Sequence, residues 1–161
     1  MTKSEAKTLA DYLINQPYLG VHLPKLGWKF GGFNKATSYM GLCSFRKRHI
    51  TISEKFLEFV TYNQVKNTIL HEIAHALDYE DRETSDHGRQ WRRIARAIGC
   101  DPSFHVNINK LAQKAGDAVY MKYKYSITCD EHGFLGGIMR RPKRKYLCQT
   151  CRKPVNIKQN Y

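Results

Sequence analysis

The chain has 161 residues, which suits one domain of ordinary size with a small appendage and is long enough to bury a core. No apolar run approaches the roughly 18 residues that a membrane-spanning helix needs, so we expect none. Lysine and arginine outnumber aspartate and glutamate by 27 to 14, and the net charge of +13 favours a polyanionic partner. A basic surface that serves only solubility is the alternative.

The N-terminus and the cysteines both indicate a reducing compartment. Residues 1–16, MTKSEAKTLADYLINQ, are charged and amphipathic, and they lack the apolar centre and the small-residue cleavage site of a secretory signal. We therefore expect a cytoplasmic protein. Five cysteines, an odd number without an export signal, indicate free thiols and metal ligands rather than a disulfide framework.

The first third of the chain predicts a helix followed by strands. Residues 4–15 have helical periodicity, with Leu9 and Leu13 on one side, and Pro17 ends the helix. Short β-like runs broken by glycine follow: WKFGGF, TSYMGLCSF and HITIS. These runs predict a meander of antiparallel strands.

Helical periodicity then returns. It predicts a helix over residues 63–79 with a buried stripe of apolar residues at every fourth position. The stripe consists of Val65, Ile69, Ile73 and Leu77. The polar stretch EDRETSD predicts a loop, and HGRQWRRIARAIG predicts a second helix closed by Gly99. Residues 107–118 predict one more helix, and from Tyr120 onward the pattern is β-like and basic.

The string LHEIAHALD, within the helix predicted over residues 63–79, carries the first chemical signal. His71 and His75 are four residues apart, so they lie on one helix face with Cβ atoms about 5–6 Å apart. Zinc accepts imidazole nitrogens at about 2.0–2.1 Å, and both rings can therefore point at one ion. Glu72 is rotated by roughly 100° from His71, beside the metal and within reach of a water molecule. This arrangement is typical of a zinc peptidase, although a solvated amphipathic helix can carry the same short string by chance.

A catalytic zinc site also needs a third protein ligand and one open position. The metzincin pattern fails, because Asp78 and Asp81 stand where it requires glycine and histidine. A thermolysin-like glutamate is also excluded, since residues 87–97 contain none. His87 remains, because the loop before it is long enough to bring it back to the metal. A solvated residue at a helix start is the alternative for His87.

The C-terminal quarter contains two paired knuckles. Cys129 and His132 form one, Cys148 and Cys151 form the other, and fifteen residues separate the two. This spacing fits a structural tetrahedral zinc held by three thiolates and one imidazole. Four unrelated surface residues are the alternative. The other two cysteines have no partner at ligand spacing and are interpreted as small core residues.

Positive charge concentrates in the same quarter, where the only acidic residues after Ala118 are Asp130 and Glu131. Between the knuckles lies MRRPKRKY, a hairpin-like basic segment. Its cationic side chains are Arg140, Arg141, Lys143, Arg144 and Lys145. Such a segment can pair with phosphates while Tyr146 or Phe134 offers a stacking face. A solvated loop is the alternative.

HEIAHALD, a polar loop and then HGRQW together resemble the zinc-peptidase core of the SprT-like family, which includes the Spartan proteases. GLCSFRKRHITIS also resembles that family's strand before the metal helix, and the family typically ends in a small zinc ribbon. The similarity spans about residues 28–155. It implies that His71, His75 and His87 hold a catalytic zinc, that Glu72 is the general base, and that Trp91 packs behind the site. His132 departs from the four cysteines that relatives often use in the ribbon.

The resemblance implies an α+β fold, with a zincin-like metallopeptidase core over residues 1–118 and a small β zinc ribbon over residues 119–161. By analogy with zincins, the HITIS strand is expected to pair with an extended peptide substrate. One catalytic and one structural zinc ion are the expected cofactors.

The function implied is that of a zinc metalloendopeptidase that binds DNA with little sequence specificity and cleaves DNA-bound proteins. Its expected location is the cytoplasm in association with DNA, or the nucleus in a eukaryote. Two other readings stay open: a DNA-binding adaptor with a vestigial HExxH site, and a metal-dependent hydrolase of non-peptide bonds.

Overall fold

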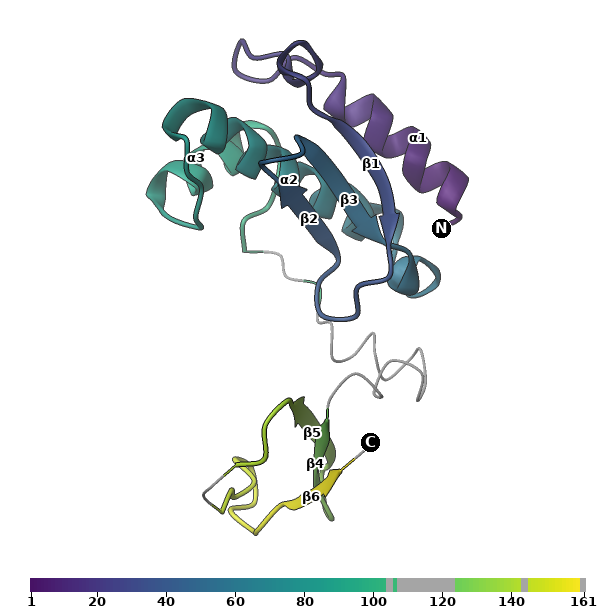
Figure 1. The fold of residues 1–161 in the computed structure, drawn as a ribbon, viewed down its shortest axis with the longest axis vertical. Helices are drawn as coiled ribbons and strands as arrows, with labels where there is room; N and C mark the ends of the chain where they lie inside the picture. Colours follow the sequence, from purple (N-terminus) through teal and green to yellow (C-terminus); the bar gives the residue numbers. More distant parts are fainter. Residues whose placement is uncertain (104–105, 107–123, 143–144, 160–161) are drawn as a thin grey trace. The chain divides into compact units, whose positions relative to one another are not determined.

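A computed structural model describes the chain except for residues 104–105, 107–123, 143–144 and 160–161 (Figure 1). The chain divides into two compact units, Met1–Ile108 and Asn109–Tyr161, and each is described by itself. The helix predicted over residues 107–118 and the domain boundary predicted after residue 118 lie outside the described residues.

Unit 1 begins with helix α1 (Lys3–Ile14), close to the range predicted from periodicity. Its start is a capping box: Glu5 N–H donates to the Thr2 hydroxyl, and Thr2 N–H donates to the Glu5 carboxylate. Leu9 and Leu13 are buried, and α1 runs alongside β1 (Figure 1). A short 3-10 helix, η1 (Leu23–Leu26), follows.

The sheet of unit 1 has three strands in the order β1-β3-β2. Its members are β1 (Lys29–Asn34), β2 (Gly41–Ser44) and β3 (His49–Ser53). β2 pairs antiparallel with β3 as predicted, but β1 pairs parallel with β3. The predicted antiparallel meander is therefore wrong, because β3 lies between the two strands that precede it in the chain.

Burial explains why β3 takes the central position. Ile50 and Ile52 are fully buried, so this strand gains most from neighbours on both edges. Residues 35–40 carry the chain past the end of β3, where Ser53 holds them. Ser53 Oγ donates to the Ala36 carbonyl at 2.5 Å, and Ser53 N–H donates to the Met40 carbonyl at 2.8 Å.

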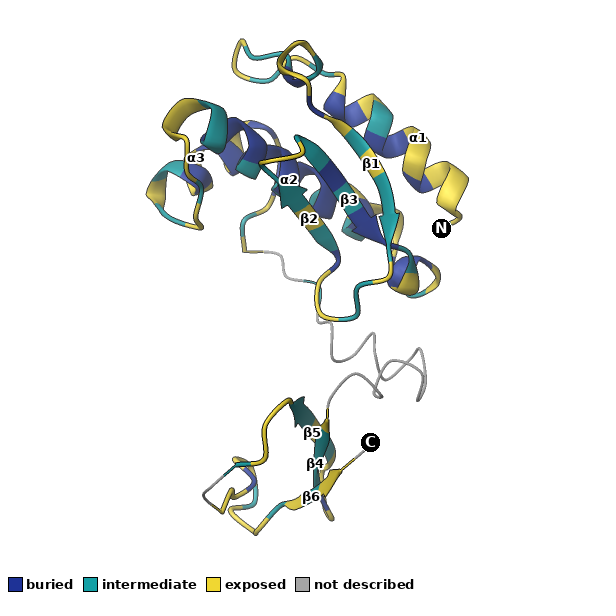
Figure 2. Ribbon diagram, in the orientation of Figure 1, coloured by how far each residue is buried: buried dark blue, intermediate teal, exposed yellow. Residues whose placement is uncertain are grey.

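A second 3-10 helix, η2 (Glu54–Phe59), leads into the long helix α2 (Tyr62–Arg82). The predicted stripe of Val65, Ile69, Ile73 and Leu77 is buried, and Figure 2 shows α2 largely buried against the sheet. Three residues assigned to the polar loop, 80–82, continue the helix instead. Arg82 pairs with Asp78 one turn earlier, and Glu83 ends the helix in the left-handed region with φ of 57°.

Helix α3 (Arg89–Ala97) starts two residues later than predicted, with Gly88 as its N-cap. His87 consequently belongs to the loop rather than to the helix. The predicted closure at Gly99 is confirmed, since Gly99 has φ of 81° and the N–H of Cys100 donates back to the Ala95 carbonyl.

Unit 2 contains a three-stranded antiparallel sheet in the order β5-β4-β6. The strands are β4 (Tyr125–Cys129), β5 (Gly133–Ile138) and β6 (Asn156–Gln159). Helices and small sheets thus occupy separate parts of the chain, and a cysteine and histidine cluster lies at one end of the second sheet. This is the α+β class predicted, with a C-terminal element consistent with a zinc ribbon.

Candidate metal centres

Three histidine rings of unit 1 meet at one point. The Nε2 atom of His75 lies 3.2 Å from that of His71 and 3.1 Å from that of His87, and the remaining Nε2 separation is 3.0 Å. Nitrogen ligands at the corners of a tetrahedral zinc site lie about 3.3 Å apart for bonds of 2.0–2.1 Å. The three imidazoles therefore fit a metal ion, and one tetrahedral position is left for another ligand.

The loop between α2 and α3 returns the chain to α2. Glu83 ends α2, and the Asp86 carboxylate then accepts a hydrogen bond of 2.6 Å from the Gly88 N–H, which tightens the turn around His87. His75 Nδ1 lies 2.8 Å from Ser85 Oγ, so this loop also touches the helix directly. Burial and then the nearby His87 lower the pKa of His75 to about 4, which leaves its ring neutral at pH 7.

Trp91 of α3 forms the base of the histidine cluster. Its ring centroid lies 4.6 Å from that of His71, 5.1 Å from that of His75 and 4.7 Å from that of His87. The side chain is 1% exposed, so it packs behind the cluster, as predicted, and restricts the rotation of all three rings.

Glu72 is buried beside the cluster, with 8% of its surface exposed. Burial raises the pKa of its carboxyl to about 8, while the Cys43 N–H, which donates to the carboxylate, acts in the opposite direction. A cation held by the adjacent histidines favours the charged form and would lower this pKa. Glu72 also lies against the backbone of Gly41 in β2, where a side chain would collide with it.

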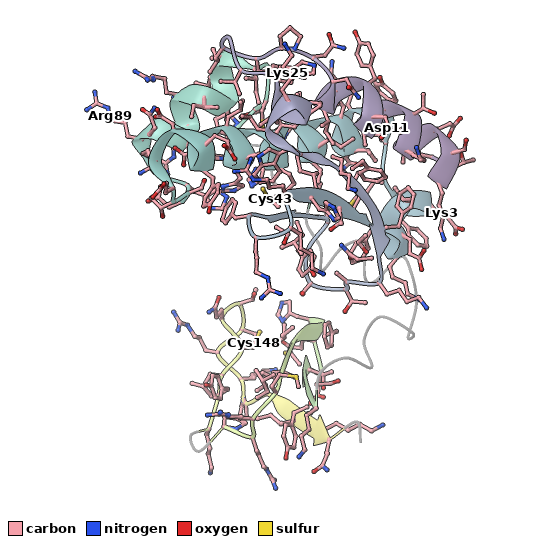
Figure 3. All side chains as sticks on the ribbon, turned by 45° about the horizontal axis from the view of Figure 1, so that its top comes forward. Lys3, Asp11, Lys25, Cys43, Arg89 and Cys148 are labelled. Atoms are coloured by element: carbon pink, nitrogen blue, oxygen red, sulfur yellow. The ribbon has the colours of Figure 1, made fainter. Side chains whose placement is uncertain are left out.

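The histidines and Glu72 open onto a groove of about 450 Å³. One side is formed by residues 38–43 and Phe45, in and around β2, and the other by α2 and the loop that carries His87. Figure 3 shows Cys43 inside unit 1, whereas Arg89 projects outward from α3. Within the described residues, β2 pairs with no strand other than β3, and the Cys43 N–H of β2 donates to Glu72.

This topology corrects the prediction for the HITIS strand. HITIS forms β3, which is paired on both sides, by β1 and by β2, and has no free edge for a peptide. The edge strand beside the groove is β2, contributed by the preceding run TSYMGLCSF.

The four knuckle residues of unit 2 also converge. Cys129 Sγ lies 3.6 Å from His132 Nδ1 and 3.6 Å from Cys151 Sγ, and Cys148 Sγ lies 3.6 Å from His132 Nδ1. Ligands of a tetrahedral zinc site with bonds of about 2.3 Å to sulfur and 2.0–2.1 Å to nitrogen are separated by about 3.5–3.8 Å. The set therefore fits a closed metal site of three sulfurs and one nitrogen.

Local backbone geometry prepares the second knuckle for a metal. Backbone N–H groups of Cys151 and Thr150 donate to the Cys148 sulfur and lower its pKa to about 6, which favours the thiolate that binds metal. The turn is closed by Arg152 N–H, which donates to the Cys148 carbonyl at 2.9 Å.

The basic segment follows β5 and precedes the second knuckle, and its predicted hairpin-like shape involves residues 143–144, which lie outside the described residues. Arg140, Arg141 and Lys145 are exposed, while Lys143 and Arg144 lie outside the described residues. Tyr146, which follows directly, is 50% exposed. Charged and aromatic side chains of this segment are therefore exposed on unit 2.

Sequence reasoning missed the residues that support the ligands. Asp78 is fully buried on α2 and accepts hydrogen bonds from Arg82 Nε at 2.8 Å and Arg82 Nη2 at 2.6 Å. Burial raises the pKa of Asp78, but hydrogen bonds from Arg82 and Ser85 outweigh it and hold the pKa below its usual value. The available signals were an aspartate and an arginine four residues apart on the metal helix and a serine two residues before His87.

Comparisons with known proteins identify the family of the chain. The model of the SprT-like family matches residues 13–111. The chain is also similar to Protein SprT of Glaesserella parasuis serovar 5 (strain SH0165), with 23% identity over 140 residues that cover 84% of this chain and 83% of that protein. No solved structure matches. In the part of the chain that the structure describes, no helix is long and apolar enough to cross a membrane. Because the family model matches more than half of the residues of this chain, the chain belongs to the SprT-like family.

Proposed function

We propose that this protein is a zinc-dependent endopeptidase that associates with DNA and cleaves proteins bound there. The observation that carries the proposal is the convergence of three imidazole Nε2 atoms beside a buried carboxylate in one groove. His71, His75 and His87 would hold the zinc ion. When bound, zinc supplies Lewis acidity and lowers the pKa of a water molecule toward about 7.

Glu72 is assigned the role of general base and acid. Its carboxylate would accept a proton from the water that attacks the scissile carbonyl and then deliver that proton to the leaving amine. The contact with Gly41 and the hydrogen bond from the Cys43 N–H limit the positions that this carboxylate can adopt. The side chain is therefore held next to the histidine cluster before a substrate arrives.

The edge of β2 that pairs with no strand among the described residues supports a peptide as the substrate class. An extended chain can add to an exposed strand edge through main-chain hydrogen bonds, which do not depend on the sequence of the added segment. A peptide placed along residues 41–44 would run through the groove that contains Glu72.

DNA association is supported by the surface of unit 2. Arg140, Arg141 and Lys145 are exposed and form no ion pair with an acidic side chain among the described residues. Contacts of lysine and arginine with phosphate are independent of base sequence, and exposed Tyr146 offers a ring on which a base can stack.

The decisive experiment compares Glu72→Gln with His87→Ala in the purified full chain. Cleavage of an unfolded protein and of a DNA-bound protein is measured together with the zinc content. Glu72→Gln is expected to keep zinc and lose cleavage, because an amide cannot accept the proton of water. His87→Ala is expected to lose both, and exposed Glu58 provides the matched control Glu58→Gln, with normal values for both.

Two results would contradict the proposal. Near-normal cleavage by Glu72→Gln would remove Glu72 from the mechanism even if the site binds zinc. A wild-type chain that binds zinc and DNA but cleaves neither substrate would favour a DNA-binding adaptor.

A further inference from the structure

Behind the metal-facing side of His75 lies a chain of polar groups, centred on buried Asp78, that the proposed catalytic steps do not use. It runs from His75 Nδ1 to Ser85 Oγ and on to the carboxylate of Asp78, which Arg82 binds through two nitrogens. Asp78 is fully buried, and a charge in that position is retained only with such partners.

The direction of each hydrogen bond follows from the donors available. The two donors from Arg82 indicate that Asp78 is an ionised carboxylate, which can only accept hydrogen bonds. The single O–H of Ser85 must therefore point to Asp78. Its oxygen can then only accept from His75, so the proton of the neutral His75 ring lies on Nδ1. The lone pair of Nε2 is thereby turned toward the other two histidines.

The contact between His75 and Ser85 also affects the position of His87, the third ligand. Ser85 belongs to the loop that follows α2 and stands two residues before His87. Arg82 Nη2 also lies 3.7 Å from the Asp86 carboxylate. Two successive residues of the loop, Ser85 and Asp86, therefore contact α2. Loosening Ser85 would release both the ring of His75 and the backbone that places His87.

We infer that Asp78, Arg82 and Ser85 form a positioning relay that fixes the Nδ1-protonated form of His75 and so sets the affinity of the three-histidine site for its metal ion. The inference rests on the proposed function only in taking these histidines as metal ligands. Without an acceptor at Nδ1 the neutral ring populates both tautomers, and the Nε2-protonated form has no lone pair for the metal. Removing such a partner typically costs about 10- to 100-fold in metal affinity.

The test measures metal affinity rather than activity. The full chain is first given one equivalent of zinc to fill the thiolate site, and Co²⁺ is then titrated into the histidine site by its visible absorption. Cobalt that enters the ribbon instead is recognised by thiolate charge-transfer bands. Ser85→Ala is expected to bind Co²⁺ about 10- to 100-fold more weakly, whereas Ser85→Thr keeps the hydroxyl and should restore affinity. Exposed Thr84, in the same loop, supplies the control Thr84→Ala with wild-type affinity.

NMR of the histidine ring nitrogens, recorded on the wild-type chain without metal at the histidine site, reports the tautomer of His75 directly. The relay requires the proton of His75 on Nδ1, and a proton on Nε2 would overturn it even if Ser85→Ala failed to fold. A loss of affinity below about tenfold in folded Ser85→Ala would also overturn it. A wild-type chain that binds no Co²⁺ at its histidines would contradict the metal site and the proposed function, which distinguishes the two failures.

Discussion

Gly41 of β2 lies directly against the side chain of Glu72: a Cβ atom at position 41 would stand 2.7 Å from Glu72 Oε1 and 2.9 Å from its Cγ. Thr68 Cγ2 would also lie only 2.8 Å away. Real Cβ atoms do not approach other atoms so closely. Any side chain at this position therefore has to displace the proposed general base or the strand beside it.

We predict that Gly41→Ala lowers kcat by about 10- to 100-fold, because a displacement of about 1 Å in a reacting group can cost that much. Zinc content should stay normal, since the three atoms nearest to the new methyl group belong to Glu72 and Thr68 and not to a histidine. Peptide cleavage and metal analysis are measured on the same preparation, with Ser44→Ala in the same strand as the control. Wild-type kcat in Gly41→Ala would show that Glu72 tolerates the displacement or does not act in catalysis.

The burial of Trp91 predicts that its replacement lowers the free energy of unfolding through lost packing and not through a lost hydrogen bond. Its Nε1 is buried with no hydrogen-bond partner in the described part of the chain, so Trp91→Phe removes packing volume and no hydrogen bond. Trp91→Ala should lower the free energy of unfolding by about 3–5 kcal/mol, and Trp91→Phe by clearly less. Urea unfolding of both variants provides the comparison. Equal losses for the two variants would mean that the contacts with the histidine rings add little.

The two ligand groups predict two zinc ions per chain. The ion in the ribbon should resist chelators longer, because its binding free energy is coupled to the folding of that element. Elemental analysis is expected to give a value near two, falling to one after the double change Cys148→Ser and Cys151→Ser. A value near one that the double change leaves unaltered would remove the ribbon as a metal site.

The basic segment predicts a salt-dependent affinity for DNA. Replacing Arg140, Arg141, Lys143, Arg144 and Lys145 by glutamine should weaken binding and reduce the slope of log affinity against log salt by about 0.9 for each lost contact with duplex phosphate. Cleavage of a DNA-bound protein should fall while cleavage of a free protein is kept, because tethering raises the local substrate concentration.

A control that removes four positive charges from unit 1, one fewer than the segment variant, tests whether this segment matters or only net charge. It replaces the four exposed arginines of α3 by glutamine and should leave the slope closer to that of the wild type. These are Arg89, Arg92, Arg93 and Arg96. An unchanged slope in the segment variant would show a solvated loop, and equal loss of cleavage on both substrates would indicate a folding defect.

Local patterns in the sequence were sufficient for α1, α2 and α3, apart from their exact ends, and for the pairs of residues that could share a metal. His71 and His75 are one helical turn apart, and the two ligands of each knuckle are three residues apart, so each pair is set by backbone geometry over a few residues. The buried stripe of α2 and the glycine that closes α3 depend on neighbours in the chain in the same way. These features could be predicted because short-range geometry decides them.

Tertiary structure decided the order of the strands and the contacts between separate elements. Strand order depends on which strand gains most from burial on both edges, and this placed β3 at the centre and left β2 as the edge beside the groove. The contact of Gly41 with Glu72, and the contacts of Ser85 with His75 and Asp78, each join α2 to a strand or loop outside that helix. Such contacts arise only when separate elements pack against one another, because the packing, and not the local chain, sets the distances between them.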